Sequence, residues 1–232
     1  MAFTKELRAE LVSLLGEDWV KDDPVTLYTY RCDGLTLYTA PPMGVVFPGN
    51  RNELVEVVKK LHSRKIPFVP RGAGTGLSGG AVPREQSVII EMARFKEIHD
   101  IDWLNRTITV GPGVINLRIS EKVQPDGYHY VPDPSSQKAC TIGGNVAENS
   151  GGPHTLKYGV TVNHVLGLEM VLPDGEVVEL GGKTFPIAGP DMLALVIGSE
   201  GTFGIVTKIT CRLTPNPEKA ITLLGVFDSV HK

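Results

Sequence analysis

Glycine is concentrated in a few short stretches of this 232-residue chain, and this clustering limits what the chain can fold into. The stretch PRGAGTGLSGG, Pro70 to Gly80, contains five glycines, and further clusters occupy residues 143–152, 181–182 and 198–204. Glycine has no Cβ atom, so backbone that is rich in glycine can approach a ligand closely. Because the clusters lie between apolar runs, we expect an ordered domain whose backbone loops hold a ligand.

The first of these loops matches a G-x-G-x-x-G pattern that begins at Gly74, but its context excludes the two common nucleotide-binding loops. A Rossmann fingerprint must open a helix, whereas Pro83 and the strand-like run SVIIEM follow here. A P-loop requires G-K-[ST] after four spacers, and residues 79–81 are Gly-Gly-Ala. Two interpretations stay open. One is a plain flexible turn, and the other is a nest whose N–H groups, with the hydroxyls of Thr75 and Ser78, surround a pyrophosphate.

The order of helical and strand patterns predicts an α+β fold with two lobes. Residues 50–61 carry apolar positions at helical spacing between two short strand runs, GVVF and IPFV. Farther along, strands are joined by turns, as in the hairpin around residues 173–175. Strands joined first through a helix and later through hairpins favour α+β over a doubly wound parallel sheet. The other expected elements are helices over 1–16, 115–123 and 191–198, and strands over 87–92, 106–114 and 204–215.

The composition excludes several classes of protein. The net charge is −3 and the pI is near 6.1, so no basic excess exists for nucleic acid or an anionic membrane. The longest apolar runs are too short to span a bilayer, and Glu6 and Glu10 in the N-terminal helix pattern argue against a secretory signal. The widely spaced Cys32, Cys140 and Cys211 predict free, buried or half-buried thiols in a reducing, cytoplasmic compartment. A nucleophilic Cys140 is the alternative.

A second constellation extends from Pro132 to Gly159, with the sequence PDPSSQKACTIGGNVAENSGGPHTLKYG. It combines glycines with the amide side chains of Asn145 and Asn149 and with several hydroxyl side chains. This density of amide and hydroxyl groups beside glycine suits a large polar and aromatic ligand that lies flat on backbone. A third cluster, IGSEGTFGIVT, leads into the last long strand.

Together these three segments resemble the FAD-binding domain of the vanillyl-alcohol oxidase / p-cresol methylhydroxylase flavoproteins. The resemblance is in particular to the glycolate oxidase FAD-binding subunit and to the D-lactate and D-2-hydroxyglutarate dehydrogenases. PRGAGTGLSGG matches that family's pyrophosphate loop, and GSEGTFGIVTKITCRLTP matches its C-terminal signature. The resemblance covers roughly residues 40–217. It implies a two-lobed fold of p-cresol methylhydroxylase type, with FAD between the lobes.

The resemblance also implies which residues bind FAD. The backbone of residues 71–77 would bind the pyrophosphate, and residues 134–147 would lie along the ribityl chain and the isoalloxazine ring. Asn149 and Gly152 would lie near the flavin's reactive side, and residues 201–206 would close over the ring and ribose. The complete set is Arg71, Gly72, Ala73, Gly74, Thr75, Gly76, Leu77, Pro134, Thr141, Gly143, Gly144, Asn145, Ala147, Asn149, Gly152, Gly201, Gly204, Ile205 and Val206. Some relatives attach the flavin through a His in the pyrophosphate loop; that loop has no His here, which implies non-covalent FAD.

Members of that family are longer and carry a C-terminal cap domain that supplies most substrate contacts. In the hydroxy-acid branch the cap contains an H-x-G-D-G-N-x-H type segment, associated with a metal and the catalytic His, and no such segment occurs here. We therefore divide the chain into an N-terminal helix and lead-in (1–39), the FAD-binding domain (40–217) and the start of a truncated cap (218–232).

Single residues outside the motifs allow fewer conclusions. Arg71 either neutralises pyrophosphate charge or pairs with a carboxylate. His154 is the one candidate catalytic residue, although a hydrogen-bonding loop histidine is the favoured interpretation. The other histidines show no paired spacing, so we expect no metal site. Lys157 and Tyr158 either shape the flavin rim or lie at the surface.

The function that the resemblance implies is that of an FAD-dependent 2-hydroxy-acid dehydrogenase or oxidase. Hydride would pass from the substrate Cα to flavin N5, while the protein positions the flavin and tunes its electronics. An iron–sulfur or quinone-linked partner would accept the electrons, and such a partner could hold the protein at a membrane surface. The alternative is a non-catalytic FAD-holding module or accessory subunit that scaffolds a partner.

Overall fold

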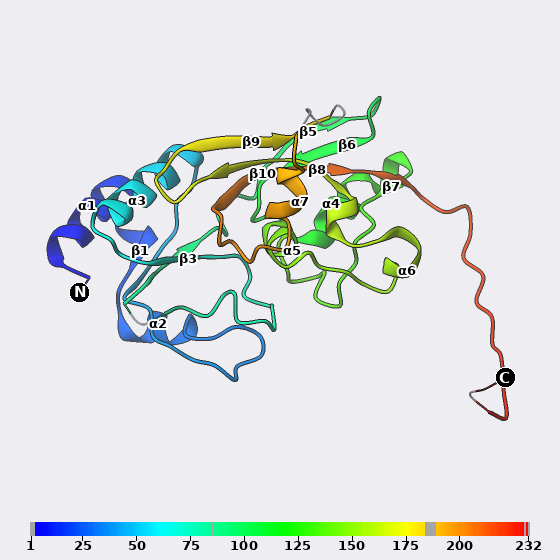
Figure 1. The fold of residues 1–232 in the computed structure, drawn as a ribbon, viewed down its shortest axis with the longest axis horizontal. Helices are drawn as coiled ribbons and strands as arrows, with labels where there is room; N and C mark the ends of the chain where they lie inside the picture. The colour runs from blue at the N-terminus through cyan, green and yellow to red at the C-terminus, as the bar shows by residue number, and fades with distance from the viewer. Residues whose placement is uncertain (1–2, 85, 184–188, 230, 232) are drawn as a thin grey trace.

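The computed structural model describes residues 3–84, 86–183, 189–229 and 231, which form two lobes side by side (Figure 1). Within these residues, the N-terminal lobe is built on a four-stranded sheet with the strand order β1-β2-β4-β3. The C-terminal lobe is built on a five-stranded sheet with the order β5-β6-β10-β8-β9, and β11 pairs with β7 in a small ribbon. The predicted two-lobed α+β architecture is confirmed.

The N-terminal lobe contains a parallel core of three strands, since β2, β4 and β3 run parallel while β1 is antiparallel to β2. Its helix α3 connects β2 to β3, as predicted. The Asn50 side chain begins α3 by accepting the N–H of Glu53 at 3.0 Å. The elements of this lobe are α1 (Lys5–Leu15), β1 (Val20–Lys21), α2 (Pro24–Thr29), β2 (Gly44–Val46), α3 (Arg51–Ser63), β3 (Phe68–Arg71) and β4 (Val88–Glu91), with a 3-10 turn at Glu17–Trp19.

Two features of the first 40 residues go beyond the sequence prediction. Helix α2 lies in a segment for which the sequence analysis predicted no helix, although Asp23 accepts the N–H of Thr26 at 2.9 Å and Pro24 follows it. An Asp N-cap followed by Pro is a standard helix start, so this signal was present in the sequence. In addition, α1 packs into the same hydrophobic core as β4 and α3. The boundary at residue 40 stays a prediction, but the lead-in shares the core of the lobe that follows it.

The C-terminal lobe is antiparallel throughout its five-stranded sheet. The predicted hairpin is confirmed as β8 and β9, and β10 alternates buried and half-buried residues up to its last residue, Arg212, which is exposed. The elements are β5 (Ile98–Asp102), β6 (Thr107–Val110), α4 (Asn116–Val123), β7 (Tyr128–His129), α5 (Ile142–Glu148), α6 (Thr155–Tyr158), β8 (Val165–Val171), β9 (Val177–Gly181), α7 (Met192–Val196), β10 (Ile205–Arg212) and β11 (Thr214–Pro215), with 3-10 turns at Gln124–Asp126 and Thr161–Asn163.

The two lobes are joined by apolar packing and by a buried carboxylate. Val171 and Ile205 belong to the second sheet but are buried in the core of the N-terminal lobe. Glu169 of β8 is only 5% exposed and accepts hydrogen bonds from Arg51 of α3 at 3.1 Å and from Thr207 of β10 at 2.8 Å. Because α3 belongs to one lobe and β8 to the other, this contact fixes their relative position.

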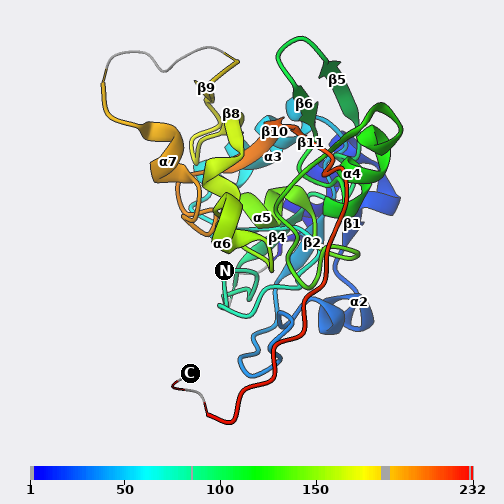
Figure 2. The ribbon, with the colours of Figure 1, turned by 90° about the vertical axis from the view of Figure 1, so that its right-hand side faces the viewer.

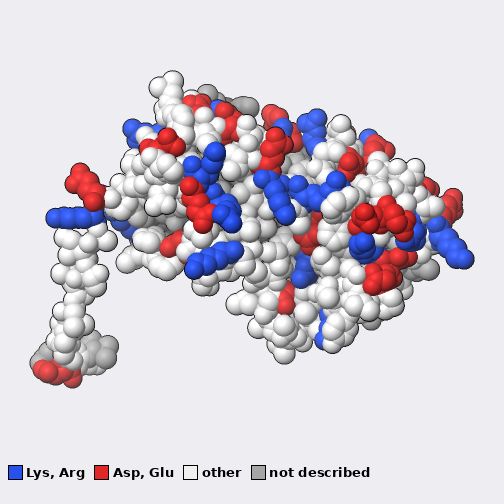
Figure 3. All heavy atoms as spheres, turned by 180° about the vertical axis from the view of Figure 1, so that it is seen from behind, with Lys and Arg blue, Asp and Glu red and all other residues white. Residues whose placement is uncertain are grey.

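Two further features are the distribution of surface charge and the extended C-terminal segment. Acidic and basic side chains are intermixed over the back of the molecule, without a large area of one sign (Figure 3). Residues 218–229 contain no helix or strand and extend away from the lobes (Figures 1 and 2). Their assignment to a second domain stays a prediction. No helix in the described ranges is long and apolar enough to cross a membrane.

Candidate functional site: a glycine-lined cavity between the lobes

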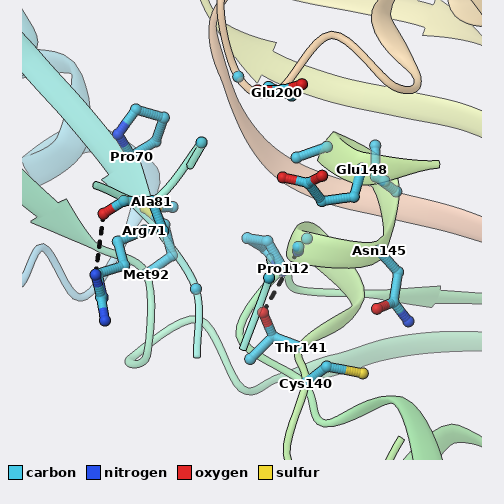
Figure 4. Close-up of a pocket in the computed structure, with 18 of the residues that line it drawn as sticks. Pro70, Arg71, Ala81, Met92, Pro112, Cys140, Thr141, Asn145, Glu148 and Glu200 are labelled. Carbon is cyan, nitrogen blue, oxygen red and sulfur yellow. Dashed lines mark hydrogen bonds between the residues drawn. The ribbon is translucent and has the colours of Figure 1, made fainter. Parts of the chain in front are cut away.

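A cavity of about 270 Å³ lies between the lobes, and three of the four glycine clusters, those at residues 70–80, 143–152 and 198–204, contribute to its walls. One wall is the end of β3 and the loop that follows it, residues 70–77 with Gly80 and Ala81. A second wall is α5 with the residues before it, and the third is the segment from Ser199 into the start of β10. Figure 4 shows the glycine loop and α5 facing each other across this space. Segments far apart in the sequence are therefore brought to one site.

Most of the residues predicted to bind a ligand line this cavity. The exceptions are Pro134, Asn149 and Gly152. Asn149 caps the C-terminus of α5 with a left-handed backbone, and its side chain accepts the N–H of Val162 at 2.9 Å. Gly152 packs directly against Asp133. The ligand contacts expected for these three residues stay predictions.

The glycine loop presents an unpaired row of backbone N–H groups. Gly74 and Gly79 adopt left-handed φ angles of +67° and +89°, which turn the chain sharply. Among the described residues, none of the N–H groups from Ala73 to Ser78 donates a hydrogen bond to the protein. Consecutive free N–H groups form a concave donor surface for an anion. The geometry therefore favours the nest interpretation over a plain flexible turn.

Arg71 is among the residues that line the cavity, but its guanidinium group lies behind the glycine loop and binds backbone carbonyls. It is 8% exposed, and its Nη1 donates to the carbonyl of Cys32 at 2.8 Å. The same nitrogen donates to the carbonyl of Ala81 at 2.9 Å, the bond drawn in Figure 4. Arg71 also lies opposite Glu91, one strand away, and its positive charge opposes the effect of burial on the pKa of that carboxyl. Holding loop carbonyls is a role that neither sequence interpretation named.

Helix α5 was missed by the sequence analysis because two glycines occupy its first turn, where helix propensity is poor. Thr141 caps the helix by accepting the N–H of Gly144 at 3.4 Å. The buried positions 142, 145 and 146 follow helical spacing, so the Thr cap and this spacing were the available signals. A Cβ atom at Gly143 would lie 2.6 Å from Pro112 Cβ, so glycine lets this turn pack against the connection between β6 and α4.

A buried amide provides a second unpaired donor at the site. Asn145 of α5 is 2% exposed and lines the cavity, and its Nδ2 has no hydrogen-bond partner among the described residues. An unpaired buried amide carries a cost of about 1–3 kcal/mol, which a ligand acceptor would relieve. The cavity therefore suits a ligand with an anionic group at the glycine loop and polar acceptor atoms near α5.

Two carboxylates and a thiol at the cavity were not among the residues predicted to bind the ligand. Glu148 accepts the hydroxyl of Ser78 at 2.9 Å, and in Figure 4 its carboxylate points from α5 toward the glycine loop. Glu200 also lines the cavity. Neither has a sequence signal, because solvent-facing acidic residues are common. Cys140 is buried, and burial raises the pKa of its thiol, which opposes the nucleophile interpretation. All three cysteines are free thiols, buried or half-buried, as predicted.

His154 does not line the cavity. Its Nδ1 lies 2.7 Å from Asp133 Oδ2, and its side chain is 66% exposed. Lys157 and Tyr158 are outside the cavity lining too, and the Lys157 ammonium lies 4.8 Å from the Tyr158 ring. This arrangement favours the hydrogen-bonding interpretation of His154. The described residues also contain no cluster of three or more His, Cys, Asp or Glu that could hold a metal.

Comparison with known proteins gives three consistent results. A family profile described as "FAD binding domain" matches residues 42–181. The glycolate oxidase subunit GlcD of Escherichia coli (strain K12) is 51% identical over 203 residues, which are 88% of this chain and 41% of that protein. The D-lactate dehydrogenase of Archaeoglobus fulgidus is 39% identical over 207 residues, 87% of this chain and 46% of that protein.

The fold is also found among solved structures. An alkyldihydroxyacetonephosphate synthase superposes with a TM-score of 0.83 at 24% identity, covering 93% of this chain and 41% of that one. Such a low identity identifies a shared fold and nothing finer. The chain spans less than half the length of each of these relatives.

Proposed function

This chain belongs to the FAD-binding domain family, and on that premise we propose that the protein oxidises small 2-hydroxy acids with FAD as hydride acceptor. The observation that supports this most is the similarity, over most of the chain, to a glycolate oxidase subunit and to D-lactate dehydrogenase. Glycolate and D-lactate share a hydroxyl group on the carbon next to a carboxylate, which defines the proposed substrate class.

The donor groups of the cavity fit FAD. The N–H groups of Ala73 to Ser78 would hold the pyrophosphate, and the unpaired Nδ2 of Asn145 would donate to the flavin ring or ribityl chain. Residues 201–206 would cover the ring and ribose. Bound FAD supplies the two-electron acceptor for the oxidation. The glycine loop contains no His, so we propose that the cofactor is held without a covalent bond.

The cavity supplies binding groups, and we propose that the proton acceptor comes from outside it. The titratable residues that line the described cavity are Arg71, Cys140, Glu148 and Glu200. Arg71 is held by two carbonyls and the Cys140 thiol is protonated, so neither removes a proton from a substrate hydroxyl. We propose that this base comes from a further region of the intact protein, the cap domain of the family.

One relative is named as a subunit, so partner subunits belong to the proposal. We propose that an iron–sulfur or quinone-linked partner reoxidises the flavin in one-electron steps. The protein would then be cytoplasmic, or held at the membrane surface by that partner.

The test is an anaerobic titration of the FAD-loaded protein with glycolate, D-lactate and D-2-hydroxyglutarate, followed through the visible flavin absorbance. We expect at least one of the three to bleach the flavin of the intact protein. A flavin that dithionite reduces and none of the hydroxy acids reduces would contradict the proposal.

That negative result would support a second candidate, a non-catalytic module that holds FAD for a partner. The observation in its favour is that no histidine lines the cavity within the described residues.

A further inference from the structure

The glycine loop does not stand alone, because a segment about forty residues earlier in the chain holds it from behind. We call residues 32–35 the anchor segment. Gly34 donates its N–H to the carbonyl of Gly76 at 3.0 Å, and Asp33 Oδ2 accepts the N–H of Gly79 at 2.9 Å. The carbonyl of Cys32 accepts from Arg71 at 2.8 Å. The anchor segment therefore binds the loop at its start, its middle and its end.

Asp33 is the central residue of this arrangement. Its side chain is 6% exposed, and its other oxygen accepts the N–H of Leu35 at 2.9 Å. Both carboxylate oxygens are thus used, one to shape the anchor segment and one to hold the loop. A buried carboxylate is costly unless it is well bonded. Here Arg71, which binds the neighbouring carbonyl of Cys32, brings a positive charge to the same region.

These contacts determine which way the loop's peptide groups point. The described peptide bonds are trans, so the C=O and N–H of one peptide unit point in opposite directions. Because the Gly76 carbonyl points to Gly34, the N–H of Leu77 points away from the anchor segment. Leu77 lines the cavity, and its N–H belongs to the unpaired row described above. Because the Gly76 carbonyl accepts from the anchor segment, the N–H of Leu77 is free to donate to a ligand in the cavity.

The approach between the two segments is close enough to depend on glycine. A Cβ atom at Gly34 would lie 2.9 Å from the carbonyl oxygen of Thr75 and 3.1 Å from that of Gly76. Any side chain at this position would push the anchor segment away from the loop.

We propose that Asp33 is a positioning residue for the cofactor, which holds the glycine loop in the conformation that binds the pyrophosphate. The anchor segment lies before residue 42, outside the part of the chain that the family profile matches. The inference rests on FAD binding and is independent of the proposed oxidation. Pre-forming the loop avoids an ordering cost when the cofactor binds, which is why the effect should appear as affinity.

The experiment compares ligands that do and do not carry the pyrophosphate. FAD and ADP both contain it, whereas riboflavin contains only the ring and ribityl chain. The affinity of each for the full chain would be measured by calorimetry or flavin fluorescence, with Asp33→Ala and Gly34→Ala beside the wild type. We expect both substitutions to weaken the binding of FAD and of ADP by about 10- to 100-fold, since buried hydrogen bonds to a charged group are lost or displaced. Riboflavin affinity should stay within about twofold, a difference too small to reflect a lost hydrogen bond.

Asp23→Ala is the matched control, because Asp23 lies in the same lead-in and accepts a backbone N–H, from Thr26, without touching the loop. It should leave the ratio of FAD to riboflavin affinity unchanged. Asp33→Asn keeps one acceptor oxygen and should recover part of the ADP affinity. Equal losses for riboflavin and ADP would overturn the proposal, because they indicate general destabilisation. Unchanged ADP affinity in both Asp33→Ala and Gly34→Ala would overturn it as well.

Discussion

Glu91 lies directly opposite Arg71 on the adjacent parallel strands β4 and β3, and both side chains are buried. Burial raises the pKa of Glu91 to about 7, while the charge of Arg71 and the N–H groups of Met92 and Ala93 limit the rise. This pair lies where β3 leads into the glycine loop, since Arg71 is the last residue of β3. The protonation state of Glu91 therefore affects the stability of the N-terminal lobe, which carries the loop.

The raised pKa of Glu91 predicts how stability depends on pH. Between about pH 4.5 and about pH 7 the folded chain keeps a proton on Glu91 that the unfolded chain releases. The contribution of Glu91 is therefore fully present below that window and is lost as pH rises through it, by about 3 kcal/mol in total. Urea unfolding of the cofactor-free chain at a series of pH values measures this. Glu91→Gln should flatten the dependence, and the exposed Glu121→Gln should not. Parallel curves for wild type and Glu91→Gln would contradict the prediction.

Two neighbouring glycines of α5 should respond oppositely to alanine. At Gly143 the new methyl group meets Pro112, so Gly143→Ala should lower the free energy of unfolding by about 1–3 kcal/mol. At Gly144 the nearest atom, Thr141 Oγ1, is 3.6 Å away, so Gly144→Ala should stabilise the cofactor-free chain by about 0.5–1 kcal/mol. Gly144 lines the cavity, however, so the methyl group added by alanine should weaken FAD binding by about tenfold or more. Denaturation and FAD titration of both variants check this; a Gly144→Ala variant that binds FAD as tightly as wild type would contradict it.

His154 should be dispensable for flavin reduction in the intact protein. Its ring is mostly exposed, bonded to Asp133 and outside the cavity lining. His154→Ala should change the rate of flavin reduction by hydroxy acid by less than about threefold, whereas loss of a general base costs about 100-fold or more. Stopped-flow reduction with saturating substrate makes the measurement. A decrease of about 100-fold would identify His154 as the base.

The flavin should leave the protein on acid denaturation. The glycine loop contains no His that could form a covalent bond to the flavin. Cys140 is the one cysteine in the cavity lining of the described residues, and burial raises the pKa of its thiol, which keeps it protonated and weakly nucleophilic. After acid precipitation of the FAD-loaded protein, the yellow colour should be found wholly in the supernatant. Colour that stays in the pellet would show a covalent link, and Cys140→Ser would then test whether that cysteine carries it.

Local patterns in the sequence were sufficient for the elements whose residues interact mainly with near neighbours. The apolar spacing of α3 and the turn between β8 and β9 are short-range signals, and each predicted its element. The glycine clusters likewise predicted a binding site formed by backbone groups, because glycine lets the backbone approach a ligand closely. Helix α5 shows the limit of this reasoning: packing of Gly143 against Pro112 overrides a poor propensity.

The sequence by itself determined the two-lobed α+β class, the family and the loops that build the cavity, since these depend on composition and local order. Only the tertiary structure decided which side chains meet. It placed Asp33 under Gly79, Arg71 beside the carbonyls of Cys32 and Ala81, and the carboxylate of Glu148 against the glycine loop. Such contacts join residues 10 to 70 positions apart, and no periodicity relates them. They follow from how two lobes and three loops pack, and packing is a property of the whole chain.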